Sequence, residues 1–444
     1  MLSGVEHPAG TNRIVRAAPA GLLTLVLLAC GGSVLGGEGG GHGVLVVAVD
    51  GLRADHLGSF GYDRDTSPNL DALARSGVSF RDALACSPLT LPSHIGLLSG
   101  TEPFLAQRRL REDFGFERWN LAPRLPSLAV EFLAAGWRTA AFLGTPELGE
   151  VEGLRRGFLE WSTSKVPFDP EEVGVRRLLA WVRGQRDRNW FAYIELADLS
   201  RAFGRSWTRA PSPWERYFEP RPSLSEIPPV ASTDDVFFAI PNSSWRGGAR
   251  PLGEYEALYD GEVRRVDAEI GAIIAGLRRL GLEETTTLAV VGVNGMQFGE
   301  AGLYLRSGLY SPADLRVPFL LRLRAGHAGT AGTVVRGLVS GLDLAPTLLE
   351  SEGIAIPAGM RGVSRLAEAL GRDEGAHGPR RVFVSCGLLG GGAVFEGSHA
   401  YELTLPGQLQ KGSLRRSWFG ALEPDAGALP VVRAYDFEET AFPP

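Results

Sequence analysis

Two residues of the sequence, Asp50 and Thr90, could lie together in the fold and contribute a carboxylate and a hydroxyl to an anion-binding site. Asp50 directly follows the apolar, β-branched run 44–49, which is typical of a strand buried on both faces of a sheet. Sheets of this kind bind ligands beyond the carboxyl ends of their strands. Thr90 lies in a loop just before a Pro-Ser helix start, where free backbone N–H groups favour an anion. The sequence therefore predicts an anion site at one edge of a sheet.

Four motifs around these residues occur in a fixed order. They are Asp50-Gly-Leu-Arg-Ala-Asp-His-Leu-Gly, Thr66-Ser-Pro-Asn-Leu-Asp, Thr90-Leu-Pro-Ser-His, and Leu258-Tyr-Asp-Gly-Glu-Val-Arg-Arg-Val-Asp. Together they resemble the sulfatase-like branch of the alkaline phosphatase superfamily. The resemblance implies that Thr90 stands at the position of the family's nucleophile, which in sulfatases is a cysteine converted to formylglycine. His94 then falls where sulfatases have arginine, and threonine at the nucleophile position is typical of phosphate-handling relatives.

The same resemblance implies where the metal ligands belong, and most of these positions have changed. Asp50 is retained, but the second metal-binding strand, which usually ends in Asp-His-Gly or Asp-Asn-Gly, here reads Val293-Asn294-Gly295. Histidines of the family correspond to Glu195, Ser200 and Ala301. A buried cation needs carboxylates to offset its desolvation, so the sequence does not support a two-metal centre. Asp50 and Asn294, with Glu300 nearby, could still hold one divalent ion (Mg²⁺, Ca²⁺ or Zn²⁺).

Each retained residue also has a structural interpretation. Asp50 could be a metal ligand, or it could cap the sheet edge by accepting backbone N–H bonds. Thr90 could be a nucleophile, or its hydroxyl could satisfy a free N–H at the helix start. His94 could contact a substrate or serve as a structural hydrogen-bonding group, and Asn294 could be a ligand or a turn residue. For His56 we expect a structural role.

Three classes of function follow. The leading hypothesis is a catalytically impaired pseudoenzyme that keeps the scaffold for binding or envelope assembly. The alternative is a divergent hydrolase or transferase of sulfuric or phosphoric esters, with Thr90 as nucleophile and one divalent metal. A third class is a structural envelope protein that uses the Trp- and Pro-rich stretch 199–252 as a contact surface. The expected ligand bears sulfate or phosphate, and the sequence leaves its identity and the oligomeric state open.

The beginning of the chain predicts an exported lipoprotein. Arg13 and Arg16 precede a short apolar run that ends in Leu-Leu-Ala-Cys30, which resembles a bacterial lipobox. The resemblance implies cleavage before Cys30 and attachment of membrane lipid to it, at the periplasmic or cell-surface side of the envelope. The alternative is an ordinary secretory signal in residues 1–30. Residues 31–43 read as a Gly-rich tether.

Composition narrows the partners. The chain has 444 residues and a net charge of −6 without long basic runs, which argues against nucleic acid as a partner. Besides Cys30 there are two cysteines, Cys86 and Cys386, which could pair or could both be buried thiols.

Apolar patterning predicts an α/β protein with a mostly parallel, doubly wound sheet and helices on both faces. We expect a sulfatase-like domain over 44–380, with 199–252 as a long surface excursion, and a small antiparallel subdomain over 381–444. The pattern predicts strands at 44–49, 137–144, 191–198, 285–294 and 317–323, and helices at 67–77, 127–136, 258–280 and 342–353.

Overall fold

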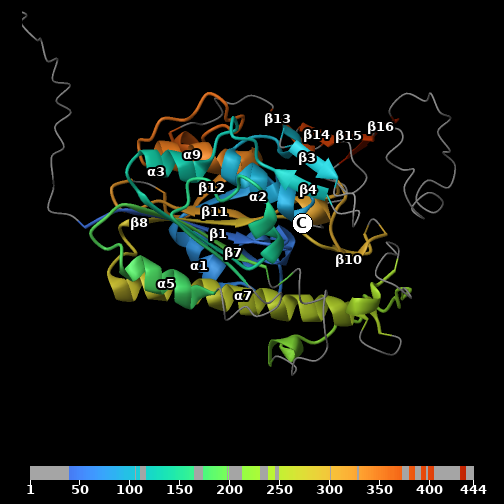
Figure 1. Ribbon diagram of the computed structural model, residues 1–444. Coiled ribbons are helices and arrows are strands. Elements are labelled where there is room, and N and C mark those ends of the chain that lie inside the picture. The colour runs from blue at the N-terminus through green and yellow to red at the C-terminus, as the bar shows by residue number, and fades with distance from the viewer. Residues whose placement is uncertain are drawn as a thin grey trace, which may run out of the picture. The chain divides into compact units, whose positions relative to one another are not determined.

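The computed structural model describes most of the chain from residue 40 onward (Figure 1). The described residues are 40–105, 107–110, 117–164, 174–197, 199, 213–230, 239–245, 250–300, 302–327, 330–372, 380–385, 392–396, 399–404 and 431–436. The predicted signal segment with Cys30, the greater part of the tether, and Cys386 lie outside them. No helix in these ranges is long and apolar enough to cross a bilayer.

An eight-stranded sheet forms the centre, in the order β12-β2-β11-β8-β1-β7-β5-β6. The central strand β1 runs parallel to both of its neighbours, β7 and β8, whereas β11 is antiparallel to β8 and β2. The predicted mostly parallel α/β fold is therefore confirmed. The strands are β1 (Gly43–Val49), β2 (Val78–Leu84), β5 (Arg138–Leu143), β6 (Glu160–Thr163), β7 (Trp190–Leu196), β8 (Thr286–Gly292), β11 (Phe319–Arg322) and β12 (Thr333–Ser340).

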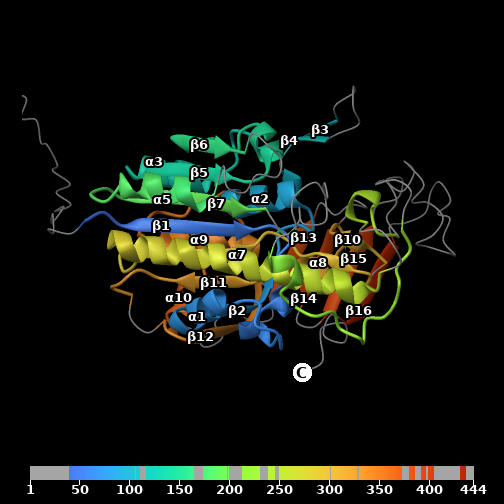
Figure 2. The same ribbon diagram turned by 90° about the horizontal axis from the view of Figure 1, so that it is seen from below.

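Helices cover both faces of this sheet, as Figures 1 and 2 show. The side chains of Val44 and Val46 enter one hydrophobic cluster, and those of Leu45 and Val47 enter the other. This is the alternation of a strand that is buried on both sides. The first cluster is closed by α2 (Thr90–Ser99), α3 (Leu128–Ala134) and α9 (Leu344–Ser351), and the second by α1 (Pro68–Ser76), α5 (Val175–Arg183) and α7 (Leu252–Leu280).

Smaller sheets flank this core. A four-stranded antiparallel sheet near the end of the chain matches the predicted C-terminal antiparallel unit, whose boundary at 380 stays a prediction. It comprises β13 (Arg381–Ser385), β14 (Gly392–Glu396), β15 (His399–Thr404) and β16 (Val431–Asp436). Two hairpins pair β3 (Gln107–Leu110) with β4 (Glu117–Asn120) and β9 (Gln297–Phe298) with β10 (Tyr304–Arg306).

Several element boundaries differ from the pattern. The helix α7 begins at Leu252, before the apolar stripe that predicted it, so its first turns lie between the expected excursion and the predicted start at 258. Ser127 does precede α3, but its hydroxyl donates to the backbone oxygen of Arg156 instead of capping the helix. The strands β2 and β12 were missed, because charged and half-exposed residues interrupt their apolar pattern.

Candidate functional site

Three of the residues singled out by the sequence meet at the carboxyl ends of β1 and β8. Asp50 directly follows β1, Asn294 comes shortly after β8, and Thr90 is the first residue of α2. The Thr90 hydroxyl Oγ1 lies 3.0 Å from Oδ1 and 3.2 Å from Oδ2 of Asp50. The Gly51 N–H donates to Oδ1 of Asn294 at 3.4 Å. Asp50 and Asn294 are buried and Thr90 is half-buried, so Thr90 is the most accessible of the three residues.

The structure corrects one interpretation of Thr90. The N-cap position of α2 is Leu89, and no side chain caps the helix. The Thr90 hydroxyl therefore does not satisfy a free N–H at the helix start, since it donates to the Asp50 carboxylate instead. A hydroxyl on a carboxylate is an arrangement in which the carboxylate could act as a general base.

The residues at the metal-ligand positions do not fit the divalent metal that the family resemblance implies. Val293 is fully buried and offers no side-chain oxygen. The amide nitrogen of Asn294 donates to Ser307 Oγ at 2.8 Å and to the backbone oxygen of Pro88 at 3.3 Å. Glu300, considered as a further ligand, instead forms an ion pair with Arg53. Throughout the described part of the chain no group of three His, Cys, Asp or Glu side chains could hold a metal ion.

His94 belongs to a separate buried network beside this group. Thr90 and His94 lie one turn apart on the same face of α2. The His94 Nδ1 is 2.6 Å from the Tyr193 hydroxyl, and its Nε2 is 3.3 Å from Oε1 of Glu195. Glu195 also accepts the Thr145 N–H at 2.8 Å and the Thr145 hydroxyl at 2.6 Å. His94 is 0% exposed, so these contacts favour its structural interpretation.

Tyr193 was not singled out from the sequence. Tyr193 shares a strand face with Glu195, because residues two apart point the same way, and this was the available signal. Thr145 lies after β5, where sequence order alone does not place it beside β7. Asp198, at the end of the strand predicted over 191–198, lies outside the described residues.

His56 has the structural role expected of it. Its Nδ1 is 2.7 Å from Oδ1 of the fully buried Asp260. The other oxygen of Asp260 accepts the Tyr62 hydroxyl and a guanidinium N–H of Arg64, both at 2.7 Å. This network ties the loop after β1 to the helix α7.

Burial and hydrogen bonds act in opposite directions on Glu195. Burial raises the pKa of its carboxyl, but hydrogen bonds and charge interaction with His94, together with the Thr145 bonds, bring the pKa below its usual range. Burial and the nearby Glu195 charge raise the pKa of the Tyr193 hydroxyl. The network is therefore built around an ionised Glu195.

Replacing Glu195 with glutamine should destabilise the protein in a pH-dependent way. The amide cannot accept from both Thr145 donors and His94 together, so about 1–3 kcal/mol of unfolding free energy should be lost at pH 7. Because the folded pKa is lowered, the carboxylate's stabilisation is present above the usual glutamate pKa and is lost as the pH falls through the folded value. Urea unfolding of both proteins across the acidic range should show their difference shrinking as the pH falls. A difference independent of pH would contradict the ionised network.

Comparisons with known proteins agree with the fold and the motifs. The family model described as Sulfatase matches residues 42–149 and 203–354, more than half of the chain. An arylsulfatase of Clostridium perfringens is 23% identical over 72% of this chain and 77% of its own length. The human N-sulphoglucosamine sulphohydrolase is 27% identical over 71% of this chain, but the match spans 62% of that protein.

Solved structures show the same fold at low identity. The phosphonate monoester hydrolase of Agrobacterium radiobacter superposes with a TM-score of 0.66 at 18% identity, over 90% of both chains. A second structure, BT4656 in complex with its substrate D-glucosamine-2-N,6-O-disulfate, superposes with a TM-score of 0.63 at 14% identity, over 90% of this chain and 91% of that chain. On the family model, the motifs and this architecture, the chain belongs to the sulfatase family.

Proposed function

We propose that this sulfatase-family protein is a pseudoenzyme, which uses the family's scaffold to bind ligands or envelope partners and does not cleave esters by the metal-dependent route. The observation that carries the proposal is Val293, a fully buried aliphatic side chain at a metal-ligand position. The two other candidate oxygen ligands already have partners within the protein: the Asn294 amide oxygen accepts the Gly51 N–H, and the Glu300 carboxylate pairs with Arg53.

Charge supports the same conclusion. A sulfate or phosphate ester beside Thr90 would face the Asp50 carboxylate, and the His94 imidazole is turned toward Tyr193 and Glu195. Like charges in a poorly solvated site repel strongly unless a cation offsets them. An anionic ligand of this protein would therefore bind at a different surface.

The test is metal content and turnover of the purified full-length chain. After incubation with Mg²⁺, Ca²⁺ or Zn²⁺ and removal of free ions, mass spectrometry should find no stoichiometric metal. Any hydrolysis of aryl sulfates or aryl phosphates should proceed at the same rate in the wild type and in Thr90→Ala. A stoichiometric ion or a Thr90-dependent turnover would reject the pseudoenzyme.

One contact favours a second candidate, a divergent ester hydrolase or transferase. The Thr90 hydroxyl already donates to Asp50 at 3.0 Å, which is the geometry of a nucleophile and its base. In this reaction Thr90 Oγ1 would bond to phosphorus or sulfur as its proton passes to Asp50, and the bond to the ester oxygen would break, so that the alcohol leaves with a proton from solvent. Water, or an acceptor alcohol in a transferase, would then take the phosphoryl or sulfuryl group from Thr90, with Asp50 accepting its proton. Turnover abolished by Thr90→Ala and Asp50→Asn but retained by Thr90→Ser would support this candidate.

We further propose that the protein is exported and anchored through Cys30 to the membrane of the bacterial envelope. The support is the sequence Arg13, Arg16, apolar run, Leu-Leu-Ala-Cys30. The wild type should sediment with membranes and incorporate labelled fatty acid, and Cys30→Ser should lose the label. Equal labelling of the two proteins would reject the anchor.

A further inference from the structure

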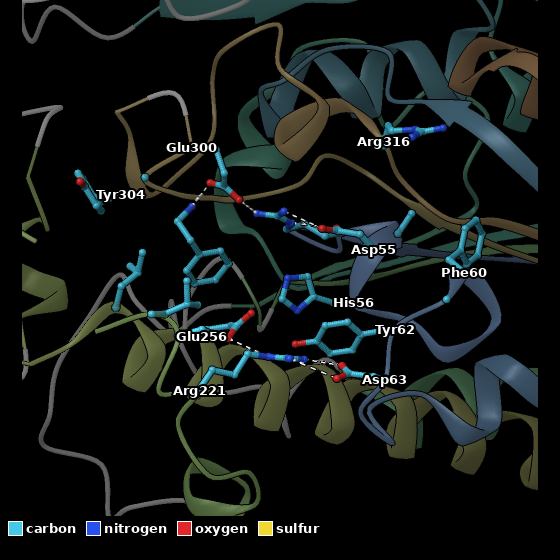
Figure 3. Close-up of a pocket in the computed structure, with 18 of the residues that line it drawn as sticks. Asp55, His56, Phe60, Tyr62, Asp63, Arg221, Glu256, Glu300, Tyr304 and Arg316 are labelled. Atoms are coloured by element: carbon cyan, nitrogen blue, oxygen red, sulfur yellow. Dashed lines mark hydrogen bonds and ion pairs between the residues drawn. The ribbon is translucent and has the colours of Figure 1, made fainter. Parts of the chain in front are cut away.

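A large cavity with many charged side chains in its walls lies apart from the Asp50–Thr90–Asn294 group. Its volume is about 1040 Å³, and its walls come from the loop after β1, the strands β2 and β12, the start of α7 and the β9–β10 hairpin. None of Asp50, Thr90, His94 or Asn294 lines it. In Figure 3 Arg316 and Phe60 lie at one end of the drawn pocket and Tyr304 lies at the other, with His56 between them. A cavity of this size accommodates a small organic molecule.

Three arginines, Arg81, Arg316 and Arg336, gather in the wall formed by β2, β12 and the start of β11. Arg316 pairs with Asp82 at 3.0 Å, and the second oxygen of Asp82 accepts the Gly337 N–H at 2.9 Å. In the described part of the chain no carboxylate forms an ion pair with Arg81 or Arg336. The local balance is therefore positive, with three guanidinium groups around one carboxylate.

An irregularity in the sheet brings Arg336 to this place. In the ladder between β12 and β2, Val335 pairs with Phe80 and Leu338 with Asp82, so Arg336 and Gly337 together oppose Arg81 alone. Gly337 takes up the irregularity with a φ of 100°. Such bulges redirect a side chain and are frequent beside functional sites.

Arg81 is held in position by the loop after β1, at the same end of the cavity. Its guanidinium donates to the backbone oxygens of Ser59 and Phe60 and lies 5.1 Å from the centre of the Phe60 ring. Burial and the charges of Arg336 and Arg316 lower the pKa of Arg81, although Asp82 acts against them. Like charges on neighbouring strands, such as those of Arg81 and Arg336, destabilise a sheet. Unfavourable arrangements of this kind are expected at functional sites, where a bound ligand can offset them.

The rest of the cavity has the opposite character. Two arginines there, Arg53 and Arg221, pair with Glu300 and Glu256. Carboxylates still outnumber them, since Asp55, Asp63 and Glu226 also line this part, together with the rings of Phe298 and Tyr304. Carboxylate oxygens accept hydrogen bonds from hydroxyl or amino groups. The charge therefore changes from one end of the cavity to the other.

We propose that this cavity binds a small hydroxyl- or amine-bearing molecule through its single phosphate or sulfate group, held by Arg81, Arg316 and Arg336. Guanidinium groups match the oxygens of such an anion in a planar, bidentate way. The site goes beyond the proposed function, because it lies outside the family's centre and its failure would leave the pseudoenzyme proposal intact.

Calorimetric titration of the full-length chain tests the proposal with glucosamine 6-phosphate, glucosamine 6-sulfate and glucosamine. Both esters should bind more tightly than glucosamine, and their relative affinity shows which anion the site prefers. Arg336→Gln removes an exposed charge and should weaken both esters at least about tenfold, the usual effect of losing one charged hydrogen bond. Arg81→Gln should do the same in protein shown to be folded. Arg75→Gln, the same change at an exposed position of α1 outside the cavity, should have no effect.

Two further measurements make the test decisive. Thr90→Ala should leave ester binding unchanged, because Thr90 does not line the cavity. Without ligand, Arg336→Gln should raise the unfolding temperature relative to Arg75→Gln, since it relieves repulsion at Arg81. The proposal would be overturned if neither ester binds, or if Thr90→Ala loses ester binding. It would also be overturned if Arg75→Gln and Arg336→Gln change the ester affinity equally.

Discussion

Replacing Val293 with aspartate should make the stability of the protein depend on divalent cations. Val293 is fully buried, and its backbone N–H is hydrogen-bonded to Val49 at the end of β1, next to Asp50. A carboxylate introduced there would lie near the Asp50 carboxylate in a site without a neutralising cation. Burying an unpaired charge costs several kcal/mol, so we expect the metal-free variant to be strongly destabilised.

The same substitution should create a cation site. Two carboxylates, the amide oxygen of Asn294 and the Thr90 hydroxyl would supply oxygen ligands, which Mg²⁺ and Ca²⁺ prefer. An ion that binds only the folded state at one hundred times its dissociation constant adds about 2.7 kcal/mol of stability. Thermal unfolding of Val293→Asp should therefore shift upward on adding Mg²⁺ or Ca²⁺, while the wild type should not respond.

Val293→Asn is the matched control, because it has the shape of the aspartate variant without its charge. It should be destabilised by an imperfectly bonded polar group but should show little response to cations. A wild type that responds as strongly as Val293→Asp would mean that the native residues already hold an ion. Ester hydrolysis should not return with the metal site, since Glu195 and Ala301 replace histidines of the family resemblance.

The secondary-structure elements that were predicted best are those that a single continuous segment of the sequence defines. The strand β1 and the helix α1 were predicted closely, because one buried run and one Ser-Pro start define them locally. The motif order also placed Asp50, Thr90 and Asn294 at neighbouring positions, and their side chains do lie together. Their roles in any reaction stay predictions.

Contacts between distant segments could not be predicted in this way. Glu300 was considered as a metal ligand on its nearness in sequence to Asn294, but its carboxylate faces Arg53 in the loop after β1. His94, Glu195 and Thr145 come into contact because β5, β7 and β1 are neighbours in the sheet, an order that no local pattern shows. The meeting of Arg81 and Arg336 needs both a missed edge strand and an irregular ladder, neither of which leaves a local pattern.

Replacing Asp343 with alanine should cause a large loss of stability. Asp343 is fully buried and interacts with two arginines, Arg365 at 3.2 Å and Arg380 at 2.7 Å. It also accepts the N–H groups of Ser340 at 3.0 Å and Val363 at 2.8 Å. Removing the carboxylate takes the fully buried counter-charge from Arg365, whose side chain is 4% exposed, and leaves it paired with Glu368 alone at 2.7 Å. Breaking a buried pair in this way costs about 3–5 kcal/mol.

Chemical unfolding of Asp343→Ala beside Asp65→Ala, the same change at an exposed position, measures this loss. Arg380 directly precedes β13, so Asp343 also fixes the point at which the C-terminal sheet leaves the core. Removing Arg380 as well should recover part of the loss, because the charge that Asp343 balanced there disappears. A loss below about 1 kcal/mol, the value typical of exposed ion pairs, would show that these arginines find other partners or water. A double variant less stable than Asp343→Ala would show that Arg380 holds the sheet by its packing, and that the ion pair with Asp343 is secondary.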